Sequence, residues 1–250
     1  MTGPLAPDGR TVVVAVDHPL YSWPCAGLED RAATIRAAVD AGADAIIAGY
    51  GTVRDVRDAF GGAAAILKLD VTTVTVGGDY PLTEYVPAYT VEDALRVGAS
   101  AVLTFVQLGA DFELEALRTA GRVAAASDRA GVPYVCEIMP VESARFPDPY
   151  DPVAIAGATR TAVELGARVV KTSMPTPADA VADAAAFGVP VILAGGDLSS
   201  DRDSLFAAVA MAMSCGASGV AYGRNVWGAA DPAGTVRELA RIVHGSTTPE

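Results

Sequence analysis

The hydrophobic positions of the chain fall into short runs separated by longer stretches of mixed polarity. Each run is rich in valine, isoleucine, leucine and alanine and shows little alternation with polar residues, which is typical of parallel strands buried on both faces. The sequence therefore predicts eight strands, at Thr11–Asp17, Asp44–Ala48, Ala64–Asp70, Ser100–Gln107, Pro133–Ile138, Arg168–Thr172, Val189–Ala194 and Gly219–Tyr222.

Helical stretches fill most of the gaps between these runs, and a glycine often stands just before the next run. Such a glycine is typical of the left-handed position that ends a helix. The pattern occurs at Gly42, Gly98, Gly131, Gly166, Gly188 and Gly216. The main helices are predicted at Leu28–Ala41, Phe112–Ala130, Pro152–Leu165, Pro177–Phe187, Asp201–Cys215 and Pro232–Val243.

Strict alternation of strand and helix predicts βαβ units, and eight of them make an α/β fold of the (β/α)8 TIM-barrel type. An open doubly wound sheet is the alternative, but no Gly-x-Gly-x-x-Gly follows the first strand. We expect one domain over residues 1–250, a long loop at Val71–Tyr89 and a loose tail at Gly245–Glu250.

The composition narrows the class of protein. The formal net charge of −12 and the lack of a basic stripe argue against a nucleic-acid partner. The odd number of cysteines, Cys25, Cys136 and Cys215, has no Cys-x-x-Cys pair and suits a reducing cytoplasm. Neither a signal peptide nor an apolar run long enough for a membrane span is evident.

Lys171 lies near the end of the strand expected at Arg168–Thr172. Burial there disfavours the cation and favours the free amine, which is the form that attacks a carbonyl carbon. The pattern therefore indicates Schiff-base chemistry. From this strand alone, a structural lysine paired with a carboxylate is the alternative.

Side-chain alternation along the strands brings further charged groups to the same place. If Val13, Ile66, Val135 and Val169 face the barrel interior, the charged residues two or four positions later face it too. These charged side chains would then meet at the carboxyl ends of the strands, where barrel enzymes have their active sites. They are Asp17, Lys68, Asp70, Glu137 and Lys171.

Glycines follow the last two strands, at Gly195, Gly196 and Gly223, and Arg224 comes next. The loops after strands seven and eight are the usual phosphate site of such barrels, and an arginine adds a charge-assisted hydrogen bond. A glycine in a tight turn is the alternative reading of each position.

Two histidines, His18 and His244, are too few and too far apart for a typical zinc site, so we expect no metal and no cofactor. His18 is a candidate substrate-binding residue or proton relay, with a structural hydrogen bond as the alternative. Tyr21 and Trp23 follow in the first loop and are candidates to cover the site.

Four segments together resemble the archaeal-type class I fructose-bisphosphate aldolases. These segments are Val14–His18, Val169–Thr172, Ala194–Gly196 and Gly219–Trp227. The group includes the tagatose-bisphosphate aldolase (DeoC/LacD-like) relatives and the heptulosonate synthases, and the resemblance covers nearly the whole chain.

The resemblance implies a metal-independent lyase that acts on a phosphorylated sugar and forms a homo-oligomer. It makes Lys171 the residue that forms the iminium, while Asp17 orients hydroxyls and assists proton transfer. Lys68 would tune the site electrostatically and Asp70 would join the substrate-binding residues. The positions that match the family's phosphate-binding residues are Gly195, Gly196, Gly223 and Arg224.

One departure affects the substrate. Where the fructose-bisphosphate aldolases have a tyrosine before a proline at the end of strand five, this chain has Met139, which cannot transfer a proton. Glu137 is the candidate general acid/base in its place, or simply a counter-ion for a lysine. A glutamate here is more similar to the tagatose-bisphosphate branch.

We therefore expect a class I aldolase that makes or breaks a C–C bond in a phosphorylated ketose or related sugar. Three alternatives stay open: transaldolase or heptulosonate-synthase chemistry, a cofactor-free sugar-phosphate isomerase or epimerase, and a non-catalytic phosphosugar-binding protein.

Overall fold

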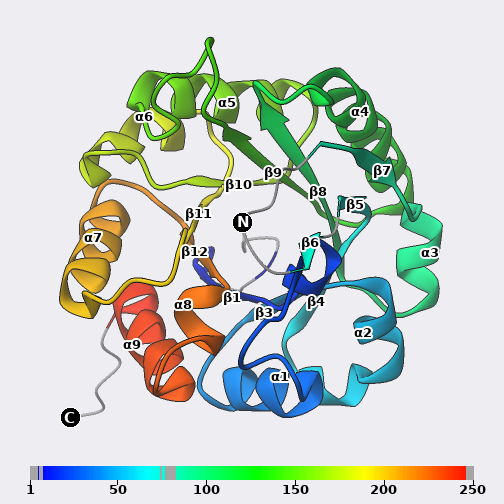
Figure 1. Ribbon diagram of the computed structural model, residues 1–250, viewed down its shortest axis with the longest axis vertical. Coiled ribbons are helices and arrows are strands. Elements are labelled where there is room, and N and C mark those ends of the chain that lie inside the picture. Colours follow the sequence, from blue (N-terminus) through cyan, green and yellow to red (C-terminus); the bar gives the residue numbers. More distant parts are fainter. Residues whose placement is uncertain (1–4, 6–7, 74, 77–82, 246–250) are drawn as a thin grey trace.

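The computed structural model describes residues 5, 8–73, 75–76 and 83–245, and within them eight parallel strands close into a barrel. Figure 1 shows the strands as an inner ring with helices around it. The predicted TIM-barrel fold is confirmed. The barrel strands are β1 (Thr11–Ala15), β3 (Ala45–Ala48), β4 (Ala64–Lys68), β8 (Ala101–Leu108), β9 (Tyr134–Pro140), β10 (Val169–Ser173), β11 (Val191–Ala194) and β12 (Gly219–Tyr222).

The helices follow the expected positions, and three short ones were not predicted. They are α1 (Arg31–Asp40), α2 (Tyr50–Asp55), α3 (Val91–Arg96), α4 (Glu113–Ala130), α5 (Pro152–Glu164), α6 (Val181–Ala185), α7 (Arg202–Ser214), α8 (Arg224–Trp227) and α9 (Pro232–His244). The sequence does not indicate α2, α3 and α8, because they are too short to show an apolar repeat. None of the helices in the described residues is long and apolar enough to cross a membrane.

Local sequence signals fix where the helices begin and end. Aspartate side chains accept the backbone N–H of the third helical residue in α1, α5, α7 and α9, which satisfies a donor that the helix leaves unpaired. All six glycines predicted to end helices have positive φ values. This conformation carries no Cβ penalty in glycine.

The segment predicted as a loop at Val71–Tyr89 contains more structure than expected. β5 (Asp70–Thr72) pairs antiparallel with β7 (Tyr85–Pro87), and β6 (Thr75–Val76) pairs with β2 (Ser22–Trp23). Residues 74 and 77–82 lie outside the described residues, as do residues 246–250 of the predicted tail. Antiparallel pairing between segments this short leaves no pattern in the sequence.

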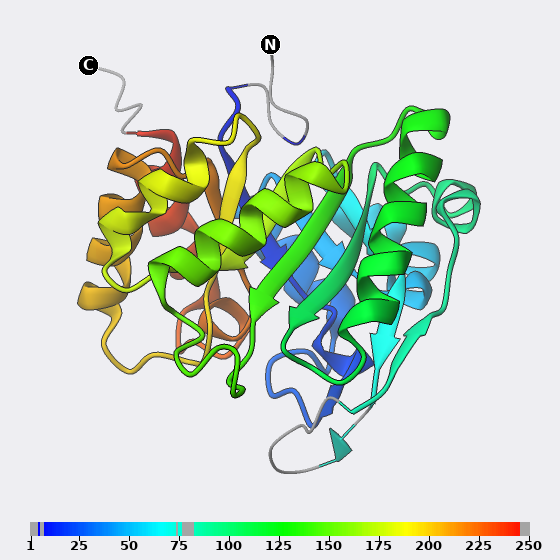
Figure 2. The same ribbon diagram turned by 90° about the horizontal axis from the view of Figure 1, so that it is seen from above.

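The predicted alternation of side chains is confirmed. A cluster of buried apolar residues fills the barrel interior, and its members include Val13, Ala15, Ile66, Leu103, Val135, Val169, Ile192 and Ala221. The residues between them pack under the helices in a second, larger cluster. In Figure 2 the arrows of the barrel strands point toward the same end of the barrel, so interior positions late in each strand converge there.

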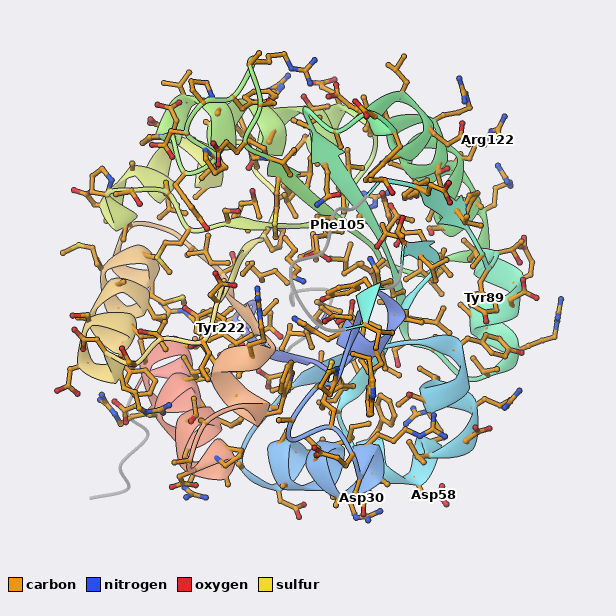
Figure 3. The ribbon with its side chains drawn as sticks, in the orientation of Figure 1. Asp30, Asp58, Tyr89, Phe105, Arg122 and Tyr222 are labelled. Carbon is orange, nitrogen blue, oxygen red and sulfur yellow. The ribbon has the colours of Figure 1, made fainter. Side chains whose placement is uncertain are left out.

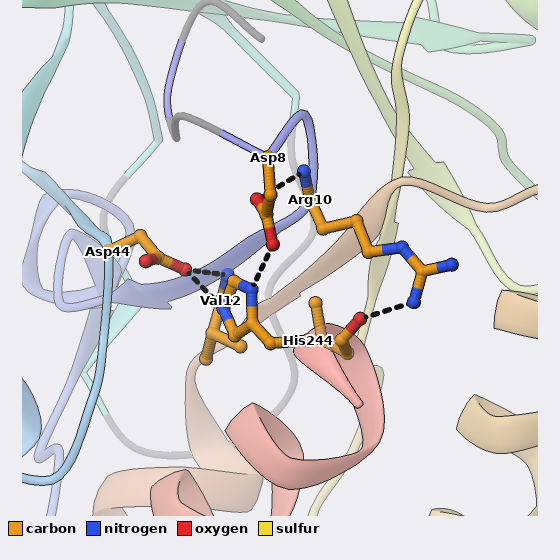
Figure 4. A network of polar contacts seen from close by, with 6 residues as sticks. Asp8, Arg10, Val12, Asp44 and His244 are labelled. Atoms are coloured by element: carbon orange, nitrogen blue, oxygen red, sulfur yellow. Dashed lines mark hydrogen bonds and ion pairs between the residues drawn. The ribbon is translucent and has the colours of Figure 1, made fainter. Parts of the chain in front are cut away.

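The opposite end of the barrel is held to α9 by a polar network (Figure 4). His244 lies 2.7 Å from a carboxylate oxygen of Asp8 and 3.0 Å from one of Asp44. The same Asp44 oxygen accepts the backbone N–H of Val12 at 2.7 Å. This network ties the last helix to the starts of β1 and β3.

Candidate active site

A cavity of about 450 Å³ opens at the carboxyl ends of the barrel strands. Its walls come from the ends of β1, β8, β9, β10, β11 and β12 and from the loops that follow them. Among the described residues that line it, the charged side chains are those of Glu137, Lys171, Asp197 and Arg224. Figure 3 labels Phe105, which also lines the cavity, near the middle of the ring of strands.

Lys171 points into this cavity, as the strand parity predicts. Its Nζ lies 2.6 Å from Oε1 of Glu137, and the two side chains are 7% and 8% exposed. The two residues are direct partners in the register of β9 and β10. The pair places an amine and a carboxylate side by side at a largely dry cavity wall, which is an arrangement suited to proton exchange during carbonyl chemistry.

Lys68 and Asp70 form a second buried ion pair, with 2.8 Å between Nζ and Oδ1. Burial by itself lowers the pKa of Lys68, but the carboxylates of Asp70, Glu137 and Asp17 outweigh it, so the net pKa lies above its ordinary value. Lys68 is therefore a fixed cation beside the barrel axis, 5.0 Å from the centre of the Phe105 ring.

Asp70 faces the protein rather than the cavity. Its Oδ2 accepts the Tyr85 hydroxyl at 2.9 Å and the backbone N–H of Phe105 at 2.6 Å, while Oδ1 faces Lys68. Neither Asp70 nor Lys68 is among the residues that line the cavity. Asp70 thus contacts Lys68 rather than the cavity, and its expected part in substrate binding stays a prediction.

Asp17 is buried but does not line the cavity either. Its Oδ1 lies 3.9 Å from Nδ1 of His18, which does line it. Burial, followed by the nearby Arg224 and Lys171 charges, lowers the pKa of His18 to about 3. His18 is therefore neutral near pH 7, so it contributes hydrogen bonding rather than charge.

The glycines after β11 and β12 have packing reasons of their own. A Cβ at Gly223 would lie 2.6 Å from His18 Cε1, and one at Gly195 would lie 2.8 Å from the Tyr222 ring. Gly196 has a φ of +64° and open space around it. All three line the cavity together with Arg224, so the four predicted anion-site residues are brought together.

Asn225 holds together the loops that form this wall, although it does not line the cavity itself. The sequence indicates no role for it. Its Nδ2 donates to the backbone carbonyls of Gly195 and Asp197, both at 2.8 Å, and its Oδ1 accepts the Ser199 N–H at 2.8 Å. One buried amide thereby fixes the loop after β11 against the end of β12.

Other lining residues were also missed. Gln107 and Ser173 occupy inward positions two residues beyond Phe105 and Lys171, so the alternation rule applied one step further would have found them. Tyr150 and Asp197 come from loops, where no periodicity indicates direction. Tyr21 lines the cavity as expected, whereas Trp23 does not and is 45% exposed.

No group of three or more histidine, cysteine, aspartate or glutamate side chains with metal-site geometry occurs in the described ranges. The amine of Lys171 and the carboxylate of Glu137 are groups of the kind that carry out covalent and acid/base catalysis.

Comparison with known proteins agrees with this geometry. A family model described as DeoC/LacD family aldolase matches residues 11–229. A 2-amino-3,7-dideoxy-D-threo-hept-6-ulosonate synthase of Halobacterium salinarum is 36% identical over 98% of this chain and 91% of its own length. A 2-amino-4,5-dihydroxy-6-oxo-7-(phosphonooxy)heptanoate synthase of Streptomyces griseus is 34% identical over 97% of this chain and 87% of its own.

Among solved structures, an archaeal fructose-1,6-bisphosphate aldolase superimposes with a TM-score of 0.86 at 29% identity, covering 97% of each chain. In that structure the catalytic lysine is covalently bound to the carbinolamine intermediate of the substrate.

Proposed function

We propose, from the premise that the chain belongs to the DeoC/LacD family of class I, Schiff-base-forming aldolases, that Lys171 is the lysine that forms the Schiff base. The observation that carries the assignment is the position of Nζ at the cavity wall, 2.6 Å from the Glu137 carboxylate. Lys68 is the other lysine of the barrel interior, but it does not line the cavity and is held by Asp70.

In the proposed reaction, the neutral amine of Lys171 attacks the carbonyl carbon of a ketone, and the carbinolamine loses water to give an iminium ion. The iminium withdraws electrons from the neighbouring carbon, which loses a proton and becomes an enamine. The enamine carbon then adds to an aldehyde, and the new alkoxide takes up a proton. Water hydrolyses the product iminium, which releases the ketone product and restores the amine of Lys171. Cleavage runs through the same steps in reverse.

We assign the proton transfers to Glu137, because its carboxylate reaches both Lys171 and the cavity. Asp17 acts in this scheme by way of His18, since Asp17 does not line the cavity. Lys68 supplies a fixed positive charge near the carboxylates of Glu137 and Asp17. Gly195, Gly196, Gly223 and Arg224 form the wall that receives the anionic end of the substrate.

For the substrate we propose the synthesis of a seven-carbon amino keto acid of the kind named for the Halobacterium and Streptomyces relatives. An aldol disconnection beside the ketone of such a product gives a three-carbon ketone and a four-carbon amino aldehyde. Met139 supports this choice over fructose bisphosphate, because it stands where the fructose-bisphosphate aldolases have a proton-transferring tyrosine.

Reductive trapping tests the assignment. The protein is incubated with dihydroxyacetone phosphate or hydroxyacetone and treated with borohydride, and the adduct is mapped by mass spectrometry. We expect the mass of the reduced ketone on Lys171, and addition of 2-amino-4-oxobutanoate before borohydride should diminish it. Adduct on another lysine, or none with either ketone, contradicts the proposal.

We also infer a cytoplasmic location and a homo-oligomer. The three cysteines are free thiols, which suits a reducing compartment. Leu114 on α4 and Val153 on α5 are 75% and 80% exposed, and such apolar side chains suit burial against another copy. Light scattering after size-exclusion chromatography measures the oligomer, and a monomeric mass contradicts it.

A further inference from the structure

The charges that line the cavity cancel in two pairs. Lys171 is paired with Glu137, and Arg224 donates a hydrogen bond through Nη1 to Oδ1 of Asp197. His18, on the same wall, is neutral because burial lowers its pKa to about 3. As the described residues stand, the wall therefore offers no net positive charge to a phosphate.

The side chain of Asp197 can leave this ion pair at low cost in free energy. Its side chain is 91% exposed, so the carboxylate can turn into water without a large desolvation cost, whereas the Arg224 side chain is only 29% exposed. The backbone of Asp197 cannot follow, because Asn225 holds its carbonyl oxygen at 2.8 Å. The carboxylate is thus tethered beside the guanidinium.

We propose that Asp197 is a tethered anion that competes with the substrate's phosphate for Arg224, and so sets how strongly the enzyme prefers a phosphorylated ketone over its unphosphorylated counterpart. The inference rests on the proposed function. Asp197 occupies Nη1 of Arg224 and places a negative charge beside it, so a phosphate gains the whole guanidinium only after Asp197 turns away. The carboxylate is thus an internal competitor with a high effective concentration. An uncharged ketone end leaves the pair closed. The products named for the two relatives differ at this end, one being 7-deoxy and the other 7-phosphonooxy.

The test is the Asp197→Asn variant, which removes the charge and keeps the size. The matched control is Asp58→Asn, since Asp58 is an exposed aspartate at the rim of the molecule (Figure 3). For each protein, kcat/KM is measured with dihydroxyacetone phosphate and with hydroxyacetone, using one aldehyde throughout. Binding of inorganic phosphate is measured by calorimetry.

We expect Asp197→Asn to raise the kcat/KM ratio of phosphorylated to unphosphorylated ketone roughly three- to tenfold, as for a partly exposed ion pair. The phosphate Kd should fall by a similar factor, and Asp58→Asn should change neither. An unchanged or lower ratio overturns the proposal, as does weaker phosphate binding.

A double-mutant cycle with Arg224→Met localises the effect. If Asp197 acts through Arg224, Asp197→Asn should change phosphate binding by less than about twofold once Arg224 is gone. An equal effect in both backgrounds would show general charge repulsion and contradict the proposal. Phosphate binding needs no turnover, so this outcome is distinct from failure of Lys171 trapping.

Discussion

Lys171 and Glu137 lie directly opposite each other in the register of β10 and β9, and their side chains meet at 2.6 Å inside the barrel. Parallel pairing places both side chains on the same face and at the same height, which is why they form a close pair. The buried ion pair that a structural lysine would show is thus present. What distinguishes Lys171 is that this pair lines an open cavity rather than packed core.

Replacing Lys171 by arginine distinguishes Schiff-base catalysis from isomerase chemistry that needs only a positive charge. Lys171→Arg keeps a cation beside Glu137 but cannot form an iminium, so we expect kcat to fall by at least about 10³-fold and borohydride trapping to disappear. Steady-state kinetics and mass spectrometry measure both. An isomerase that needs only positive charge would keep a substantial part of its activity in this variant.

Replacing Glu137 by glutamine tests the proton carrier. Glu137→Gln keeps the shape and a hydrogen-bond acceptor for Lys171 but cannot exchange a proton, so kcat should fall about 10²- to 10⁴-fold. Its KM should change far less. The matched control is Glu164→Gln on α5, an exposed glutamate paired only at the surface with Arg160. A Glu137→Gln enzyme with near-normal kcat would remove Glu137 from the mechanism.

The pair between Lys68 and Asp70 is predicted to matter for stability. Both side chains are 1% exposed, so Lys68→Met would leave a buried carboxylate without its cation. We expect the free energy of unfolding to fall by about 3–5 kcal/mol, measured by urea denaturation. The double variant Lys68→Met/Asp70→Asn should recover part of the loss, because no buried charge is left unpaired. A loss below about 1 kcal/mol in the single variant argues against a strongly coupled pair.

The network at the far end of the barrel should make stability depend on pH. Burial alone lowers the pKa of His244, but hydrogen bonds and charges from Asp8 and Asp44 outweigh it and raise the pKa above 6.5. A pKa that is higher in the folded protein stabilises below the unfolded pKa, and the contribution is lost as pH rises through the folded pKa. His244→Gln should therefore destabilise most below pH 6.5 and least at higher pH.

Thermal unfolding of His244→Gln from pH 5.5 to 9 measures this difference, with Arg237→Gln as a control at an exposed position on the same helix. The hydrogen bond from His244 also lowers the pKa of Asp8 below 3.8, so the Asp8 contribution is present above that pH and lost as pH falls. A difference between wild type and His244→Gln that does not change with pH would contradict the network's role (Figure 4).

The barrel and its inward-facing residues could be predicted because hydrophobic burial acts locally along each strand. Val169 and Lys171 lie on one face of their strand because side chains alternate along a strand, and the same holds for Val135 and Glu137. These residues therefore converge as soon as the sheet closes into a barrel. Glycines such as Gly42 and Gly166 end helices for an equally local reason, their positive φ.

Only the tertiary structure decided which charged groups are partners. Asp70 turns to Lys68, Tyr85 and Phe105 because β5 pairs back onto β7, a contact between short segments with no repeat in the sequence. Asp197 meets Arg224 because Asn225 binds two loops together. Such partners depend on strand register and loop path, which arise from long-range packing, whereas the periodicity of the sequence records only which side of its own strand or helix each residue occupies.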